Sequence, residues 1–133
     1  MNRLNGKITE IKVDGALSQV VITISEGIEI RSIVIETPES AGYLKEGSAV
    51  ELIFKETEVI ISRESSHPIS ILNKIPGVVQ EIKKGKILSE VVLSSAAGSI
   101  AAVISREAAD NLALKLGDAV VAMVKQNEIM LAE

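Results

Sequence analysis

An internal repeat constrains the fold of this 133-residue chain more than any other feature of its sequence. Gly6 aligns with Gly77, which lies 77 − 6 = 71 positions later, and the residues after the two glycines are similar. Two further pairs of glycines keep this register with at most a one-residue slip: Gly27 with Gly98, and Gly47 with Gly117. Similarity at a fixed period indicates one structural unit that is used twice.

The repeat predicts two small domains, over residues 1–63 and 70–133, joined by a linker over residues 64–69. The linker is polar and contains Pro68, as domain boundaries often do. A unit of about 65 residues buries only about 60% of its unfolded surface, so each domain alone is expected to be marginally stable. We therefore expect the two domains to stabilise each other or to pack against other subunits.

Each repeat is expected to form about five β-strands and one short helix. Residues 28–33 alternate between apolar and polar side chains, with the period of two that is typical of a half-buried strand. Between the third and fourth strands, Ser105 is a good helix N-cap, and Thr37 stands before Pro38 at the corresponding place in the first repeat. This order of elements predicts an all-β chain of two tandem small OB-like five-stranded barrels, each with one short helix.

Composition and charge disfavour several classes of function. The net charge of −4 and the 2% aromatic content do not suit nucleic-acid binding. The chain has neither an apolar run long enough for a membrane span nor a signal-like start, so we expect a cytoplasmic protein. There is no cysteine, and His67 has no neighbour at metal-ligand spacing, so no site for a bare metal ion is expected. Catalytic motifs are absent as well, which predicts a binding protein without an organic cofactor rather than an enzyme.

Three segments of the second repeat carry a family resemblance. It opens with Ser70-Ile71-Leu72-Asn73, continues with Ile104-Ser105 before the helix, and has Val124-Lys125 near its end. In this order and spacing, the segments resemble the Mop domain of the molybdate-binding TOBE class, and the duplicated chain resembles the di-Mop molbindins. The resemblance covers essentially the whole chain. It implies a cytoplasmic homo-oligomer, with a trimer favoured, that binds molybdate or tungstate for storage and homeostasis.

In that family an oxyanion site lies between two Mop units. One unit contributes an opening segment of the type Ser-x-Arg-Asn, and the other contributes a Thr-x-x-Ser segment and a lysine near the last strand. Carried onto this sequence, the resemblance implies seven oxyanion-binding residues: Thr37, Ser40 and Lys55 in the first repeat, and Ser70, Asn73, Ser105 and Lys125 in the second.

The two repeats depart from the family pattern in different ways. Leu72 stands where the family has arginine, and the first repeat opens with Met1 and Asn2, without a serine or an arginine. Ala108 replaces the second hydroxyl of the Thr-x-x-Ser segment in the second repeat. We therefore hypothesise that the better sites pair the opening segment of the second repeat with the hydroxyls and the lysine of the first, and that the reverse pairing is weaker.

These residue types suit a tetrahedral dianion. Hydroxyl, amide and backbone N–H groups donate directed hydrogen bonds, lysine supplies charge, and a helix N-terminus adds unpaired N–H groups. Taken singly, the same residues are ordinary helix caps, turn formers and solvated charges at strand ends. Only their joint occurrence in repeat order indicates a site.

One alternative function stays open from the sequence. Leu72 lacks the charged, multidentate donor that arginine would supply, which favours a ligand-free TOBE-type regulatory or oligomerisation module. A nucleic-acid-binding OB domain ranks below it, because the chain offers only Tyr43 and Phe54 for stacking on bases.

Overall fold

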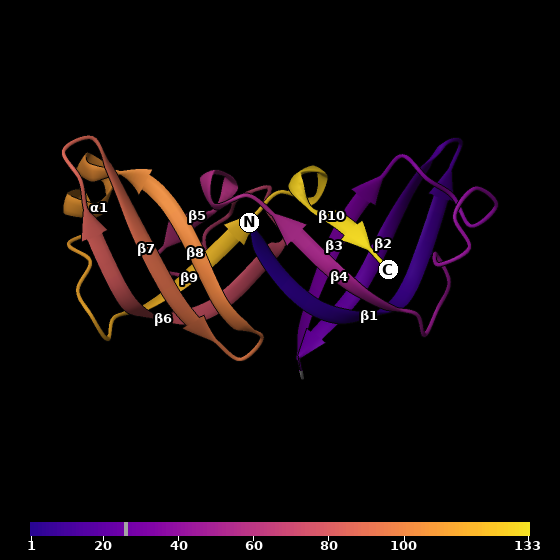
Figure 1. Cartoon of the computed structure of the whole chain (residues 1–133), viewed down its shortest axis with the longest axis horizontal. Coiled ribbons are helices and arrows are strands. Elements are labelled where there is room, and N and C mark those ends of the chain that lie inside the picture. Colours follow the sequence, from indigo (N-terminus) through magenta and orange to yellow (C-terminus); the bar gives the residue numbers. More distant parts are fainter. Residues whose placement is uncertain (26) are drawn as a thin grey trace.

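The computed structural model describes residues 1–25 and 27–133, which form two five-stranded antiparallel sheets (Figure 1). The first repeat contains β1 (Asn2–Asp14), β2 (Leu17–Ser25), β3 (Ile28–Val34), β4 (Ala49–Phe54), the 3-10 helix η1 (Glu56–Glu58) and β5 (Ile60–Ser62). The second contains β6 (Asn73–Lys84), β7 (Leu88–Ser95), β8 (Gly98–Ser105), α1 (Arg106–Asn111), β9 (Ala119–Val124), the 3-10 helix η2 (Gln126–Glu128) and β10 (Met130–Ala132). The predicted fold class is confirmed.

The two sheets exchange their last strands. One sheet has the strand order β10-β4-β1-β2-β3 and the other β5-β9-β6-β7-β8. Leu131 of β10 pairs with Leu52 of the first repeat, and Ile61 of β5 pairs with Ala122 of the second. Each repeat therefore completes the sheet of the other. The boundaries 1–63 and 70–133 describe the repeat, and independent domains with these limits stay a prediction.

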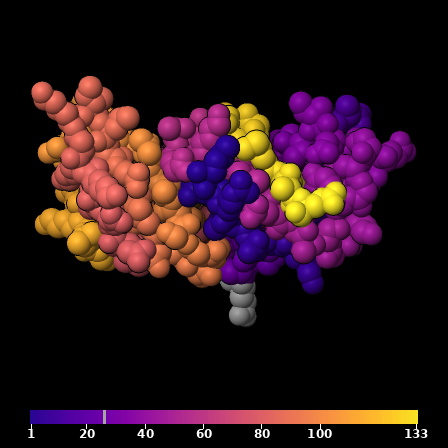
Figure 2. All heavy atoms as spheres, viewed as in Figure 1, coloured from indigo at the N-terminus to yellow at the C-terminus, as the bar shows by residue number. Residues whose placement is uncertain are grey.

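Buried aliphatic residues of both repeats form one continuous core. The exchanged segments carry buried side chains into it, with Ile61 at 7% exposure and Ile129 at 3%. Figure 2 shows the indigo N-terminal residues and the yellow C-terminal residues on one face near the middle of the molecule. The two repeats thus pack against each other, and the expectation that this packing stabilises both stays a prediction.

The first pair of glycines in the repeat, Gly6 and Gly77, lies where two strands come close together. A Cβ atom on Gly77 would lie 3.1 Å from the carbonyl oxygen of Ser94, and one on Gly6 would run into the side chain of Ile22. Both glycines stand on long strands, β6 and β1, whose register shifts two to four residues later. A side chain at either position would force a neighbouring group to shift, which favours glycine there.

The helix expected in the second repeat is present, but the one expected at Thr37 is not. The hydroxyl of Ser105 accepts a hydrogen bond from the N–H of Ala108 at 2.9 Å, and α1 follows. Residues 37–41 instead form a tight turn closed on the carbonyl of Thr37. Thr37 precedes Gly47 by 10 positions, whereas Ser105 precedes Gly117 by 12. The shorter segment leaves no room for the extra helical residues. No helix in the described part of the chain is long and apolar enough to cross a membrane.

Candidate functional site

An asparagine side chain ties the opening of each repeat to the third strand of the other. Asn73 is 1% exposed; its Oδ1 accepts a hydrogen bond from the N–H of Arg31 at 2.7 Å, and its Nδ2 donates one to the carbonyl of Arg31 at 2.8 Å. Asn2 forms the same two bonds with Ala101, both at 2.8 Å. We name these contacts the Asn73 clasp and the Asn2 clasp. In each clasp, Nδ2 keeps a second N–H for another acceptor.

The strand register places one lysine beside each clasp. Asn73 pairs with Val124, the residue before Lys125, and Asn2 pairs with Phe54, the residue before Lys55. The 3-10 helices that follow the lysines pack on the other repeat, η2 on β3 and η1 on β8. Each clasp therefore adjoins the lysine of its own repeat. Within one chain, the register does not bring Lys55 to Asn73. The pairing hypothesised from the sequence would therefore need a second copy of the chain, and it stays a prediction.

The N-terminal ammonium group adds charge at the Asn2 clasp, but a carboxylate already neutralises it. The nitrogen of Met1 forms an ion pair with Glu56, the residue after Lys55. The hydrogen bond from this ammonium group is the main reason why the pKa of Glu56 lies below its usual range. The net positive charge beside Asn2 is correspondingly small.

The segment that leads into β6 alternates between surface and interior. Ile71 is buried against Val121 and Met123, whereas Leu72 is 57% exposed and Ser70 is exposed. The hydroxyl of Ser70 therefore lies on the surface three residues before Asn73, available to a ligand. Leu72 presents an apolar side chain to solvent, not a cation.

Thr37 and Ser40 lie beyond the end of β3, away from the Asn73 clasp. Their turn is closed by a hydrogen bond from the N–H of Thr37 to the hydroxyl of Ser40 at 2.9 Å. Thr37 lines a shallow cavity beside the turn between β1 and β2, where Val13 and Gly15 also contribute. The sequence-predicted hydroxyls are therefore separated from Ser70 and Asn73 of the same chain.

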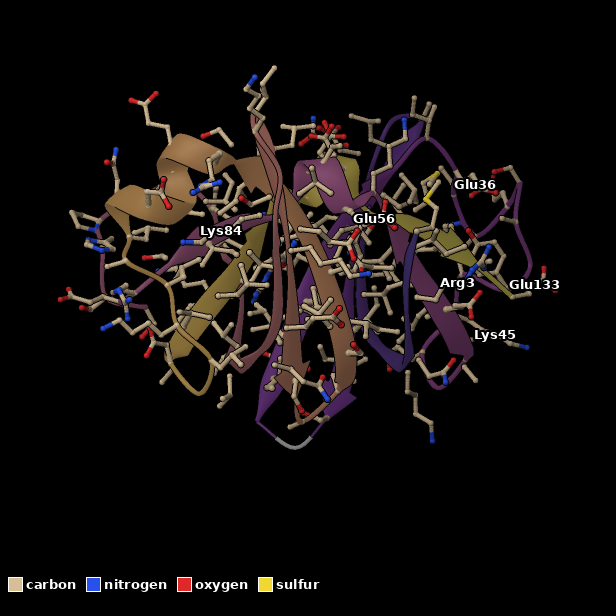
Figure 3. All side chains as sticks on the ribbon, turned by 60° about the vertical axis from the view of Figure 1, so that its left-hand side comes forward. Arg3, Glu36, Lys45, Glu56, Lys84 and Glu133 are labelled. Carbon is tan, nitrogen blue, oxygen red and sulfur yellow. The ribbon has the colours of Figure 1, made fainter. Side chains whose placement is uncertain are left out.

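The surroundings of this turn are acidic. The hydroxyl of Tyr43 donates a hydrogen bond to Glu36 at 2.8 Å, and burial together with this bond raises the pKa of Tyr43 to about 12. The C-terminal residue Glu133 also contributes to the raised pKa, and Figure 3 shows Glu36 and Glu133 at the same end of the molecule. At least two carboxylates therefore lie near this turn.

Ser105 lies at the opposite end of the molecule, next to α1 (Figure 1). It lines a cavity together with Lys86, Arg106 and Asp110. Asp110 accepts hydrogen bonds from Lys84 at 3.1 Å and from Arg106, and these bonds, with that of Lys84 the largest cause, hold the pKa of Asp110 below its usual range. Two nearby cations are thus already paired with a carboxylate.

Of the predicted residues, the structure gathers only Ser70, Asn73 and Lys125 around one clasp. Sequence analysis did not single out Arg31, whose backbone completes that clasp. No local signal could have revealed it, because the contact joins residues 42 positions apart. The role of Asn2 could have been found, since the repeat aligns it with Asn73.

Comparison with known proteins relates both the sequence and the fold to molybdenum proteins. Residues 69–131 match the TOBE domain. Molybdenum-pterin-binding protein 1 of Clostridium pasteurianum is 38% identical over 64 residues, which cover 47% of this chain and 94% of that protein. The molybdenum transport protein ModE of Herbaspirillum seropedicae is 29% identical over 133 residues, which cover 98% of this chain and 49% of ModE. The chain thus spans about half the length of this relative.

A solved structure shares the arrangement of both repeats. It is a crystal form of the cytoplasmic molybdate-binding protein ModG with molybdate bound. The two folds superpose with a TM-score of 0.91 at 26% sequence identity, over 98% of this chain and 94% of the ModG chain. The similarity therefore extends over the whole pair of repeats.

Proposed function

Because this chain belongs to the TOBE-domain family of the molybdenum-pterin-binding proteins, we propose that it binds molybdate or tungstate and holds these anions for storage and homeostasis. The observation that carries the proposal is the match of the whole chain to ModG in a crystal form that contains molybdate. The oxyanion itself is the ligand, without an organic cofactor. The protein acts by binding and release, not as an enzyme, and we place it in the cytoplasm, as ModG is described.

The proposed sites lie between copies of the chain. A dianion requires several hydrogen-bond donors and positive charge around it. Ser70 and Asn73 supply donors at one clasp, but the hydroxyls of Thr37 and Ser40 lie beyond the far end of β3. A second copy that presents its turn and Lys55 to this clasp would complete the set. We therefore propose a homo-oligomer, specifically a trimer, in which Ser105 contributes to the weaker, reverse pairing. Lys125, which the strand register places beside Asn73, contributes to the site at the Asn73 clasp.

A second candidate function is a ligand-free regulatory or oligomerisation module. Two observations favour it: the exposed Leu72 offers no charge beside the clasp, and the chain corresponds to only half of ModE, so this pair of repeats also occurs within a longer protein. Such a module would oligomerise in the same way but would take up no anion.

Isothermal titration calorimetry separates the two functions. The purified protein is titrated with molybdate, tungstate and sulfate, and thermal unfolding is followed in parallel. We expect heat and a raised melting temperature with molybdate or tungstate, because a ligand at about 100 times its Kd stabilises the folded state by about 2.7 kcal/mol. If neither metal oxyanion gives heat or a thermal shift, the storage function is wrong, and the ligand-free regulatory or oligomerisation module is the remaining function.

Mixed oligomers test whether a site is shared between copies. Ser70→Ala removes the opening hydroxyl, and Thr37→Ala combined with Ser40→Ala removes the turn hydroxyls, so each variant alone should bind weakly. When the two variants are co-expressed, some sites combine an intact opening segment with an intact turn, and strong binding should return at those sites. Thr57→Ala, in the exposed helix η1, is the neutral control. A mixture as weak as its components would place the whole site within one copy.

A further inference from the structure

We infer that the guanidinium group of Arg31 is an additional ligand for the oxyanion, at the Asn73 clasp and not at the Asn2 clasp. This inference rests on the proposed function and names a residue of the first repeat that acts at the opening of the second. The guanidinium group of Arg31 would give the Asn73 clasp a planar, multidentate cation. The ligand class is a tetrahedral dianion.

The clasp fixes the position of Arg31. Asn73 holds both the N–H and the carbonyl of Arg31, at 2.7 and 2.8 Å, so the backbone of this residue cannot move away from the opening segment. Ile30 and Ser32, on either side of Arg31, are buried at 1% and 0% exposure. Because side chains alternate along a strand, Arg31 projects from the opposite, outer face of β3, next to the clasp.

Arg31 is also the arginine whose guanidinium group forms no ion pair in the described part of the chain. Arg3 pairs with Glu51, Arg63 bonds Asp118 and two carbonyls, and Arg106 bonds Asp110. The guanidinium of Arg31 has no hydrogen bond or ion pair with any residue from 1 to 25 or from 27 to 133, although the residue is half-buried. A partly desolvated guanidinium without a partner is stabilised by an anion that supplies one.

A second cation lies on the same side of the clasp. Lys125 follows Val124, the strand partner of Asn73, and begins η2, which packs on β3. The nearest carboxylate along the outer face of β3 belongs to Glu29, which is exposed and forms no ion pair with Arg31 among the described residues. Arg31 and Lys125, which form no ion pair among the residues that the structure describes, both adjoin the Asn73 clasp, and their two charges match those of the ligand.

The other clasp lacks this arrangement. The residue that Asn2 holds there is Ala101, and the ammonium group of Met1 is already paired with Glu56. Arg31 therefore makes the two clasps unequal in charge, in addition to the divergence of the opening segments. The Asn73 clasp is the tighter site.

Calorimetric titration with molybdate, at low and at high salt, tests the inference on four proteins. Arg31→Ala should weaken binding roughly 10-fold to 100-fold, because a hydrogen bond between charged groups typically contributes this much. Arg31→Lys should recover part of the affinity, since lysine keeps the charge without the fork of donors. Arg3→Ala is the matched control, with the same change in net charge at an arginine that is already paired, and should change Kd less than twofold.

The gain-of-function variant Ala101→Arg introduces the missing cation at the Asn2 clasp and should tighten the weaker site. Melting temperatures without ligand, which should be the same for Arg31→Ala as for the unmodified protein, exclude a folding defect. If the unmodified protein binds molybdate and Arg31→Ala binds it equally well, the inference is wrong while the proposed function stands. If the unmodified protein binds neither molybdate nor tungstate, both are wrong.

Discussion

Ser18 and Ser89 occupy equivalent positions on β2 and β7, and both are completely buried. The hydroxyl of Ser18 donates a hydrogen bond to the carbonyl of Glu36 at 2.6 Å. The hydroxyl of Ser89 has no partner among the residues that the structure describes. The repeats differ here because β3 leads into a turn that carries Glu36, whereas β8 leads directly into α1.

This difference predicts that the same substitution, serine to alanine, changes the free energy of unfolding differently at the two positions. Ser18→Ala should lower the free energy of unfolding by about 1 to 2 kcal/mol, because it removes a hydrogen bond in the interior. Ser89→Ala should change it by no more than about 0.5 kcal/mol or increase it, because an unpaired buried hydroxyl is itself unfavourable. Urea unfolding followed by circular dichroism measures both. Equal losses would contradict the assignment of hydrogen bonds.

Single residues of the candidate site were predictable where the signal was local. The hydroxyl of Ser105 caps a helix as expected, because capping depends on a few neighbouring residues. Asn73 was found as a candidate ligand, but its contact with Arg31 was not, because a side chain that bonds the edge of a distant strand leaves no periodic pattern. Whether the seven predicted residues bind an oxyanion stays a prediction.

At the scale of elements, each clasp joins two strands between which the described residues form no other direct hydrogen bond. Asn73→Ala should lower the free energy of unfolding by about 2 to 4 kcal/mol, since it removes two hydrogen bonds and leaves backbone groups of Arg31 without their partner. Asn2→Ala should have a similar effect through Ala101. Chemical unfolding measures both variants.

Asn73→Asp is the graded control for this prediction. Above its pKa, aspartate keeps the acceptor for the N–H of Arg31 but cannot donate to the carbonyl of Arg31 and buries a charge, so the loss should be at least as large as that of the alanine variant. At a pH where the carboxyl group is protonated, its O–H can donate to that carbonyl, and the loss should be smaller than that of the alanine variant. An alanine variant as stable as the unmodified protein would show that the clasp contributes nothing to stability.

The end of β5 is attached to the second repeat by a pH-dependent contact. Arg63 donates to Asp118 at 2.9 Å, and this bond, followed by one from the N–H of Lys115, lowers the pKa of Asp118. A lowered pKa in the folded state means that the contribution to stability is present above the unfolded pKa and is lost as the pH falls through the folded value. Stability should therefore decrease below about pH 4.

Asp118→Asn tests this contact. The variant should be less stable than the unmodified protein at pH 7, and the difference should shrink as the pH falls and Asp118 of the unmodified protein takes up its proton. Melting temperatures measured from pH 7 to pH 3 give both curves. Parallel curves over the whole range would contradict a role for the charge of Asp118.

At the scale of the whole molecule, the repeat and its strands were predictable, but the strand exchange was not. Alternation of apolar residues is a local signal, and over residues 28–33 it located β3. Residues 59–61 and 129–131 are both short and apolar, and either barrel could accept either of them. Which sheet each segment joins depends on the direction in which the chain continues after β4 and β9. The pattern of apolar residues alone does not determine that direction.

The exchange predicts how the protein behaves when it is cut in the exposed linker. Residues 1–66 and 67–133, co-expressed as separate chains, should purify as one complex, because β5 and β10 each complete the sheet of the other fragment. Expressed alone, neither fragment should be a folded monomer, since its own last strand belongs to a partner. Size-exclusion chromatography with light scattering gives the mass in each case.

Ile129→Asp is the control for that experiment. It places a carboxylate at a position that is 3% exposed, in the segment that crosses into the other sheet, and burial of an unpaired charge should prevent association of the fragments. Glu133→Gln, four residues after the last buried position of the same segment, should leave association intact. A fragment that folds as a stable monomer would mean that its last strand can return to its own sheet, and the two barrels would then be separable domains that only exchange strands when they are joined.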